Sequence, residues 1–275
     1  MRVFVTHILP KNKFEKYRVA IAANNFSYNL IDAGLFDRVY SILPSNVSGR
    51  KDDFLSEDYR LVYSRLRRKR HFCKIASQIE NVKLFFQIKN GDFVWFYNID
   101  VLSALCFTLL KLFKRNVKLF PVVLDFTPGA KYSDFCLSLI NKADGLIKLS
   151  NSELFAVKNA VCLPGVVPNN CYYNKIAHPI KRNFLLSGVL SEHIALTSVV
   201  LEAFSRLKDV ELTIVGFTRN DEKILDYSKK FNNINYWGKV SKERFQYLLD
   251  TNPFVLSTRD KEFSENKCNF PSKII

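Results

Sequence analysis

Two glycines lie where a phosphate-binding loop would need them. Gly188 lies in Leu-Ser-Gly-Val-Leu-Ser and Gly216 in Val-Gly-Phe-Thr, and each follows a run of strand-forming residues and precedes a helical pattern. At such a junction a glycine lets a diphosphate or a nucleotide approach the backbone amides closely. For either glycine taken alone, ordinary turn chemistry is the simpler explanation.

Asp125 and His7 are two further candidates, because each follows a strand-like run. Asp125 precedes Thr-Pro-Gly at residues 127–129, which places it at the carboxyl end of a strand. There it could orient an acceptor hydroxyl, and capping the next turn explains it equally simply. His7 ends the first strand in the same way, and a structural histidine is the commoner outcome.

A basic segment is the third feature. The chain carries a net charge of +15, and no acidic residue occurs between Tyr59 and Gln78. A solvated helix face is one explanation. Attraction to an anionic membrane surface is the other, with each basic side chain near that surface contributing about 1 kcal/mol. No finger, RNP or glycine-clamp motif indicates nucleic acid binding. The predicted membrane patch consists of Arg65, Arg67, Arg68, Lys69 and Arg70.

The elements that must position these residues alternate between short β-branched or aromatic runs and helical patterns, which is typical of parallel sheets covered by helices. With 48% hydrophobic residues, the 275-residue chain can fill two cores. We therefore predict an α/β fold of two Rossmann-like domains, residues 1–180 with a basic helix near residues 58–89, and residues 181–275. In the second domain a helix should run from Ser191 to Leu207. The longest apolar stretch, residues 101–113, is too short to span a membrane.

The order of motifs in the second domain resembles the donor domain of GT-B glycosyltransferases of the family 4 type. The resemblance rests on Leu-Glu-Ala-Phe at 201–204, Leu-Thr-Ile-Val-Gly at 212–216, Ile-Asn-Tyr-Trp-Gly-Lys-Val-Ser at 234–241 and Asn-Phe-Pro-Ser-Lys-Ile-Ile at 269–275. The resemblance to this family is looser over the first domain. The resemblance implies transfer of a sugar, with retention and without an obligatory metal, in a cleft between the two domains.

The resemblance also implies the partners and the site. The donor would be a UDP- or GDP-sugar, bound as a substrate with no further cofactor, and the acceptor a glycan or a lipid-linked glycan in surface polysaccharide biosynthesis. Because no apolar stretch is long enough to span a membrane and the first domain is basic, we expect a cytoplasmic enzyme that can lie at the inner face of the cell membrane. Arg259 and Lys273 would stabilise the departing phosphates. Lys239 would lie near the nucleotide, or would be a solvated turn lysine. The donor-binding set is Gly188, Gly216, Phe217, Lys239, Glu265, Phe270, Pro271 and Ser272.

Two departures from the family motivate a second hypothesis. Many relatives carry an Arg directly after the first glycine and a Lys a few residues later, whereas this chain has Val189 and no such Lys. The sequence also stops at Ile275, before the last glutamate of the family's Glu-x7-Glu element, which we interpret as a C-terminal truncation and an incomplete second domain. The alternative is a non-catalytic GT-B-like protein that binds a nucleotide sugar or a glycan.

Overall fold

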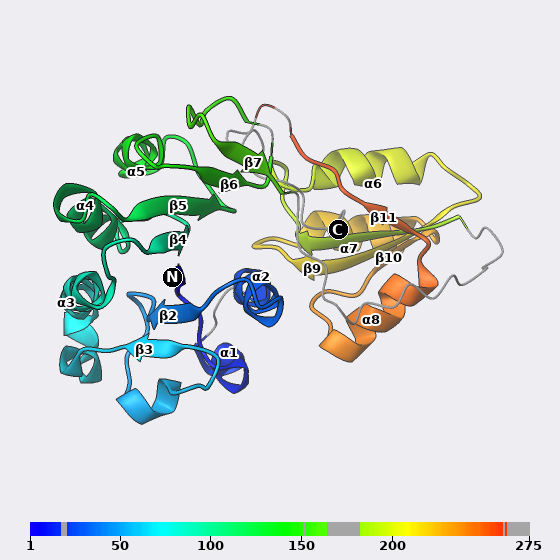
Figure 1. Cartoon of the computed structure of the whole chain (residues 1–275). Helices are drawn as coiled ribbons and strands as arrows, with labels where there is room; N and C mark the ends of the chain where they lie inside the picture. The colour runs from blue at the N-terminus through cyan, green and yellow to red at the C-terminus, as the bar shows by residue number, and fades with distance from the viewer. Residues whose placement is uncertain (18–20, 151, 164–181, 261, 263–275) are drawn as a thin grey trace. The chain divides into compact units, whose positions relative to one another are not determined.

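The protein consists of two compact α/β units, which Figure 1 shows as two sheets with their own helices. The computed structural model describes residues 1–17, 21–150, 152–163, 182–260 and 262. The first unit holds the described residues up to 163, and the second holds those from 182 onward. The predicted boundary between residues 180 and 181 touches a segment outside the described residues.

The first unit is built on a parallel sheet of seven strands in the order β3-β2-β1-β4-β5-β6-β7. Consecutive residues of its strands are buried on both faces. Phe4 and Tyr97 belong to the core on one face, and Val5 and Phe96 to the core on the other. Such near-continuous apolar runs are the pattern expected of a parallel sheet with two covered faces. The strands are β1 Arg2–Thr6, β2 Arg38–Ile42, β3 Arg60–Val62, β4 Phe93–Tyr97, β5 Lys118–Val123, β6 Leu146–Lys148 and β7 Ala160–Cys162.

The helices of this unit lie on both faces of the sheet (Figure 1). On one face are α1 Phe14–Tyr17 and α2 Ile21–Asp32. On the other are α3 Cys73–Gln87, α4 Ala104–Phe113 and α5 Ser133–Ile140. Because the chain adds β2 and β3 on one side of β1 and β4 on the other, the order reverses between β1 and β4. In open α/β sheets, ligands bind outside the carboxyl ends of the strands at such a reversal.

The predicted basic helix over residues 58–89 is wrong in its first half. Residues Arg60–Val62 form the edge strand β3, in which Arg60 pairs in register with Tyr40 of β2. Two short 3-10 helices follow, η3 Arg65–Arg68 and η4 Arg70–Phe72, before α3 begins at Cys73. Tertiary pairing with β2 therefore overrides the local helical pattern.

The second unit is a parallel sheet of four described strands in the order β10-β9-β8-β11. Helix α6 begins at Thr197 and not at Ser191 as predicted, because Ser191 caps a separate turn: its Oγ accepts a hydrogen bond from the Ile194 amide at 3.1 Å. Within the described ranges, every helix is too short or too polar to cross a membrane. The elements are β8 Asn183–Val189, α6 Thr197–Ser205, β9 Glu211–Phe217, α7 Glu222–Lys230, β10 Ile234–Tyr236, α8 Lys242–Thr251 and β11 Phe254–Leu256.

Candidate functional site

The carboxyl edge of the second sheet gathers four of the predicted donor-binding segments. Its strands are all parallel, so the segments that leave β10, β9, β8 and β11 emerge at one edge. Gly188 and Gly216 lie near the ends of β8 and β9, and Lys239 follows β10. Arg259 follows β11, whose Leu256 pairs in register with Leu186 of β8. Residues far apart in the sequence therefore share one edge.

Gly188 and Gly216 are direct register partners at this edge. Their φ angles are 112° and 146°, which L-residues with a side chain rarely adopt. A Cβ on Gly216 would lie 1.9 Å from the carbonyl oxygen of Gly188, so no side chain fits there. The Gly216 amide also donates to the carbonyl oxygen of Gly238 at 2.9 Å. Packing therefore requires a glycine at 216 and the backbone conformation favours one at 188, and Gly188 is exposed at the edge.

The side chains around the glycines differ in exposure. Phe217 is 62% exposed and Lys239 is exposed, whereas Arg259 is half-buried. The hydroxyl of Thr258, beside Arg259, donates to the carbonyl oxygen of Ala195 at 2.5 Å. This bond ties the segment after β11 to the turn that leads into α6. The edge therefore presents an aromatic ring, exposed glycine backbone and a positioned segment carrying an arginine.

Near this edge an arginine side chain lies over two aromatic rings, a cluster that the sequence analysis did not predict. The Arg244 guanidinium of α8 lies 4.3 Å from the ring centroid of Trp237 and 4.8 Å from that of Tyr247. Trp237 follows β10 directly and is 47% exposed. The Trp-Gly-Lys turn is recognisable in the sequence, but the packing of α8 against it is a tertiary contact that local pattern does not predict.

The remaining predicted donor residues lie outside the described residues, so their roles stay predictions. They are Glu265, Phe270, Pro271, Ser272 and Lys273.

The carboxyl edge of the first sheet holds the other candidates. His7 follows β1 and Asp125 follows β5, while Tyr97 ends β4 between them and Asn98 follows it. Asn98 has a φ of 49°, and its side-chain oxygen accepts a hydrogen bond from the Leu124 amide at 2.8 Å. Its own amide donates to the Val122 carbonyl at 3.0 Å. These bonds fix the end of β4 against the segment that carries Asp125.

Two unpaired polar atoms distinguish this edge. The His7 Nδ1 atom lies 2.9 Å from the Ile42 carbonyl oxygen, which can only accept, so in the neutral ring Nδ1 carries the proton and Nε2 is an acceptor. Within the described residues, His7 Nε2 and Tyr97 Oη are buried and have no hydrogen-bond partner. Buried polar atoms are nearly always paired, so a water or a ligand atom is the expected partner of these two, and Asn81 Oδ1 of α3 is a third such atom among the described residues.

The chemistry of Tyr97 follows from its surroundings. Burial raises the pKa of its hydroxyl, and the negative charge of Asp125 raises that pKa further. The phenol therefore stays protonated at neutral pH and can donate a hydrogen bond. The sequence alone does not single out Tyr97, because an aromatic residue at a strand end is usually part of the core.

The basic segment does not form a uniform surface patch, and the assignment of Arg67 to a membrane patch is wrong. Its side chain is fully buried and forms an ion pair with Glu80 at 2.7 Å. It also donates to the carbonyl oxygens of Leu43 at 2.5 Å and of Val47 at 3.0 Å. Burial raises the pKa of Glu80, while the hydrogen bonds from Arg67 oppose that rise. The other four members of the predicted patch, Arg65, Arg68, Lys69 and Arg70, are exposed.

Comparison with known proteins identifies the fold. No protein-family model and no curated protein sequence match this chain. Several solved structures do match this chain. A trehalose-6-phosphate synthase matches with a TM-score of 0.59 at 10% identity, over 94% of this chain and 77% of that one. The N-terminal domain of Candida albicans trehalose-6-phosphate phosphatase matches with a TM-score of 0.57 at 12% identity, over 94% and 76%.

A third structure extends the comparison beyond trehalose enzymes. AviGT4, a glycosyltransferase of avilamycin A biosynthesis, matches with a TM-score of 0.55 at 13% identity, over 98% of this chain and 74% of that one. The chain therefore has the GT-B fold, with two Rossmann-like units, as the sequence predicted.

Proposed function

We propose that the protein is a glycosyltransferase that moves a sugar from a UDP- or GDP-sugar to a glycan or lipid-linked acceptor. The observation that carries the proposal is the carboxyl edge of the second sheet, where paired glycines and Arg259 meet in a chain with the GT-B fold. Glycosyl transfer with retention is described for the similar trehalose-6-phosphate synthase. We extend retention and metal independence to this chain as part of the proposal.

On the donor side, the protein's own groups balance the charge of the leaving diphosphate. Gly188 is exposed at the sheet edge, so a phosphate can reach its backbone. The Arg259 guanidinium supplies a planar, permanently charged donor that suits phosphate oxygens. Lys273 adds a second positive charge in this proposal. Such groups act most strongly where charge develops on the leaving nucleotide, and no metal ion or other cofactor is then needed.

On the acceptor side, the carboxyl edge of the first sheet supplies hydrogen-bonding groups. His7 Nε2 accepts and Tyr97 Oη donates, and both are unpaired within the described part of the chain. In this proposal Asp125 orients the attacking hydroxyl. A sugar hydroxyl, which both donates and accepts, is the chemical class that suits these groups.

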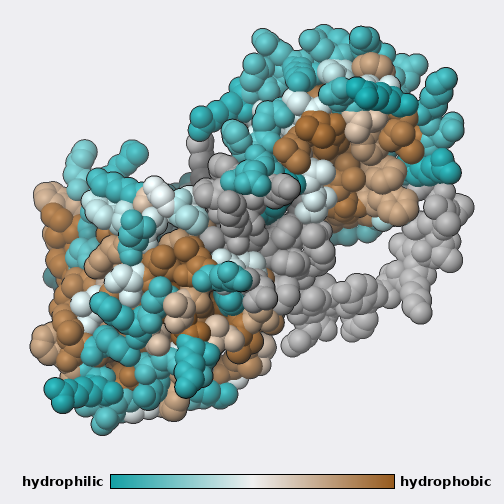
Figure 2. Space-filling view, turned by 90° about the horizontal axis from the view of Figure 1, so that it is seen from above, coloured by the Kyte–Doolittle hydropathy of each residue, from teal (hydrophilic) through white to brown (hydrophobic). Residues whose placement is uncertain are grey.

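The proposal includes peripheral attachment to the inner face of the cell membrane, where a surface polysaccharide would be extended. Helix α3 supports this, because Ile75, Ile79, Val82 and Phe86 share one helix face and are all exposed. Figure 2, which looks at the first unit from above, shows hydrophobic residues along its left margin, the side on which Figure 1 draws α4. Exposed Lys69, next to this helix, belongs to the basic segment. An apolar face flanked by cations is typical of interfacial helices.

A second candidate function is binding of a nucleotide sugar without transfer. The position after Gly188, where the resemblance predicts an arginine, is Val189, which is 48% exposed and carries no charge. A site with fewer cations would still bind a nucleotide sugar, but it would stabilise the leaving group less.

Donor binding and transfer test both functions. We expect Arg259→Gln to weaken UDP- or GDP-sugar binding at least tenfold in titration calorimetry, because a charged hydrogen bond to phosphate is lost. The matched control is Arg182→Gln, since Arg182 is exposed and directly precedes β8 at the opposite edge of the same sheet. Its affinity should change less than twofold.

The outcomes separate the two candidates. Binding together with release of the nucleoside diphosphate in the presence of glycan acceptors supports the transferase. Binding without turnover supports the non-catalytic alternative. If the folded wild-type protein binds none of the UDP-, GDP- and CMP-sugars, both are wrong.

A further inference from the structure

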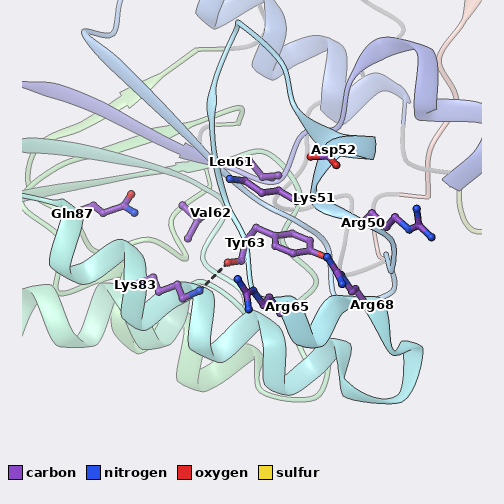
Figure 3. Close-up of a pocket in the computed structure, with 10 residues that line it drawn as sticks. All are labelled: Arg50, Lys51, Asp52, Leu61, Val62, Tyr63, Arg65, Arg68, Lys83 and Gln87. Atoms are coloured by element: carbon purple, nitrogen blue, oxygen red, sulfur yellow. Dashed lines mark hydrogen bonds between the residues drawn. The ribbon is translucent and has the colours of Figure 1, made fainter.

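A basic cavity lies beside the edge strand β3 of the first unit. Its volume is about 690 Å³, within the range of roughly 300–1,000 Å³ that small-molecule sites occupy. Figure 3 shows the side chains of Arg65 and Arg68 beneath the ring of Tyr63, together with those of Arg50 and Lys51 at the start of the 3-10 helix η2 (Lys51–Phe54). Five cations line the cavity: Arg50, Lys51, Arg65, Arg68 and Lys83.

The 3-10 helix η3 explains why two arginines point into the cavity and the one between them does not. With three residues per turn, positions i and i+3 of a 3-10 helix eclipse one another, so Arg65 and Arg68 share a face. Arg67 points the other way into the core, where its ion pair with Glu80 anchors the helix. The arginines of the basic segment therefore have two roles: the buried one fixes the 3-10 helix, and the helix holds the two exposed ones toward the cavity.

The other cavity walls are also fixed by hydrogen bonds. The Tyr63 hydroxyl donates to the Gly49 carbonyl oxygen at 2.6 Å, which holds the loop before η2 (Lys51–Phe54) against the end of β3. The Lys83 ammonium donates to the Tyr63 carbonyl oxygen at 2.9 Å (Figure 3). Gly49 has no room for a side chain, because a Cβ there would lie 2.9 Å from the Phe54 ring. The cavity is thus preformed by packing.

The positive charge of the cavity is not balanced by the protein. Across the described residues, none of the five cations forms an ion pair with a carboxylate. Of the described residues that line the cavity, Asp52 is the one acidic residue. Like charges held together in a concave site raise the local concentration of anions. An anionic ligand would relieve that repulsion.

We propose that this cavity binds a phosphorylated ligand through Arg65 and Arg68, with Arg50, Lys51 and Lys83 completing the charge balance. Guanidinium forks match phosphate oxygens in pairs, and Lys adds a point charge. The ligand class is a phosphomonoester or diphosphate, and its source is either a soluble metabolite or a lipid headgroup. Apart from Leu61 and Val62 the lining is polar, so a purely apolar ligand does not suit it.

This site is separate from the groups assigned to the acceptor. Three strands, β2, β1 and β4, lie between β3 and β5, which Asp125 follows. Four strand spacings of about 4.8 Å put the two strands about 19 Å apart, and two such spacings put β1, which His7 follows, about 10 Å from β3. The inference therefore does not depend on the proposed sugar transfer, and a ligand here would act as a second, regulatory or anchoring partner.

Titration calorimetry with inorganic pyrophosphate tests the proposal. The double variant Arg65→Gln/Arg68→Gln should weaken binding at least tenfold, because both eclipsed guanidinium groups are removed. The control Lys69→Gln/Arg70→Gln removes the same charge from the same segment, and neither residue lines the cavity. Its affinity should change less than twofold. Since all four side chains are exposed, circular dichroism should show both variants folded.

Pyrophosphate can also bind at the donor site, so the Arg259→Gln variant is titrated in parallel. The proposal requires a binding isotherm that is kept in Arg259→Gln and lost in Arg65→Gln/Arg68→Gln. UDP-sugar binding should show the reverse pattern, which separates failure of this site from failure of the proposed function. Absence of saturable pyrophosphate binding to the cavity, or an equal loss in both double variants, would falsify the proposal.

Vesicle experiments identify the source of the ligand. Stronger binding to phosphatidic acid vesicles, which carry phosphomonoester headgroups, than to phosphatidylglycerol vesicles indicates a lipid headgroup if pyrophosphate displaces it. Pyrophosphate binding by the cavity without that preference indicates a soluble ligand. Either result is compatible with the proposed site.

Discussion

The carboxyl edge of the second sheet and the basic segment of the first unit are built in opposite ways. At the sheet edge, backbone packing determines the structure: Gly216 fits only because it has no side chain, and it packs between Gly188 and Gly238. In the basic segment, side-chain contacts determine the structure, and neighbouring arginines have different environments. A glycine that the backbone requires can therefore be recognised in the sequence. The sequence does not show which members of a run of like charges are buried and which are exposed.

The largest expected effect comes from the buried member of the basic segment. Arg67→Ala should lower the free energy of unfolding by about 5 kcal/mol, because it leaves Glu80 as a buried unpaired charge and removes a donor from three carbonyl oxygens. Urea denaturation measures this. Arg65→Ala, two residues away and exposed, should change the same quantity by less than about 0.5 kcal/mol. Equal losses would show that the basic segment is not divided as described.

The next effect belongs to the backbone-built edge. Gly216→Ala should cost about 3 kcal/mol, since strained backbone and an added methyl group in a packed site each cost about 1–3 kcal/mol. Gly34→Ala is the control, because Gly34 has a φ of 65° and nothing within 4 Å of its Cβ position. That variant should cost about 1 kcal/mol from backbone strain alone. Hydrogen exchange should place the loss of protection in β8 and β9, and unchanged exchange there would contradict this.

The alternation of strands and helices was predictable because buried parallel strands have a strong local signature. Val3 to Val5 is an apolar run buried on both faces, as expected in a doubly covered sheet, and Val94 and Phe96 of β4 are buried in the same way. The errors arose where tertiary contacts prevail over local pattern. Arg60 enters β3 through pairing with β2, and α6 begins six residues later than predicted, at Thr197.

The candidate site was predictable only where a residue's role is fixed by its own backbone. Gly188 and Gly216 were found because a glycine between strand and helix is visible in the sequence. Tyr97 and His7 were harder, since an unpaired buried atom depends on every neighbour around it. Arg67 could not be distinguished from Arg65 and Arg68, because the eclipsing of η3 and the position of Glu80 exist only in the folded chain.

The smallest effect concerns the exposed members of the basic segment. Lys69→Gln/Arg70→Gln should weaken binding to phosphatidylglycerol vesicles about tenfold, because each basic side chain near an anionic surface contributes up to about 1 kcal/mol. Co-sedimentation measures this, and added salt should reduce the difference, since exposed charges are screened.

The control for membrane binding removes the same charge elsewhere. Lys229→Gln/Lys230→Gln takes two exposed lysines from the last turn of α7 in the second unit. If vesicle binding depends on the segment next to the apolar face of α3, this variant should bind almost as well as the wild type. A tenfold loss in both variants would mean that total charge governs the attraction, and the basic segment would then have no special role at a membrane. A loss confined to Lys69→Gln/Arg70→Gln would give the segment three roles: a buried anchor, a cavity lining and a surface contact.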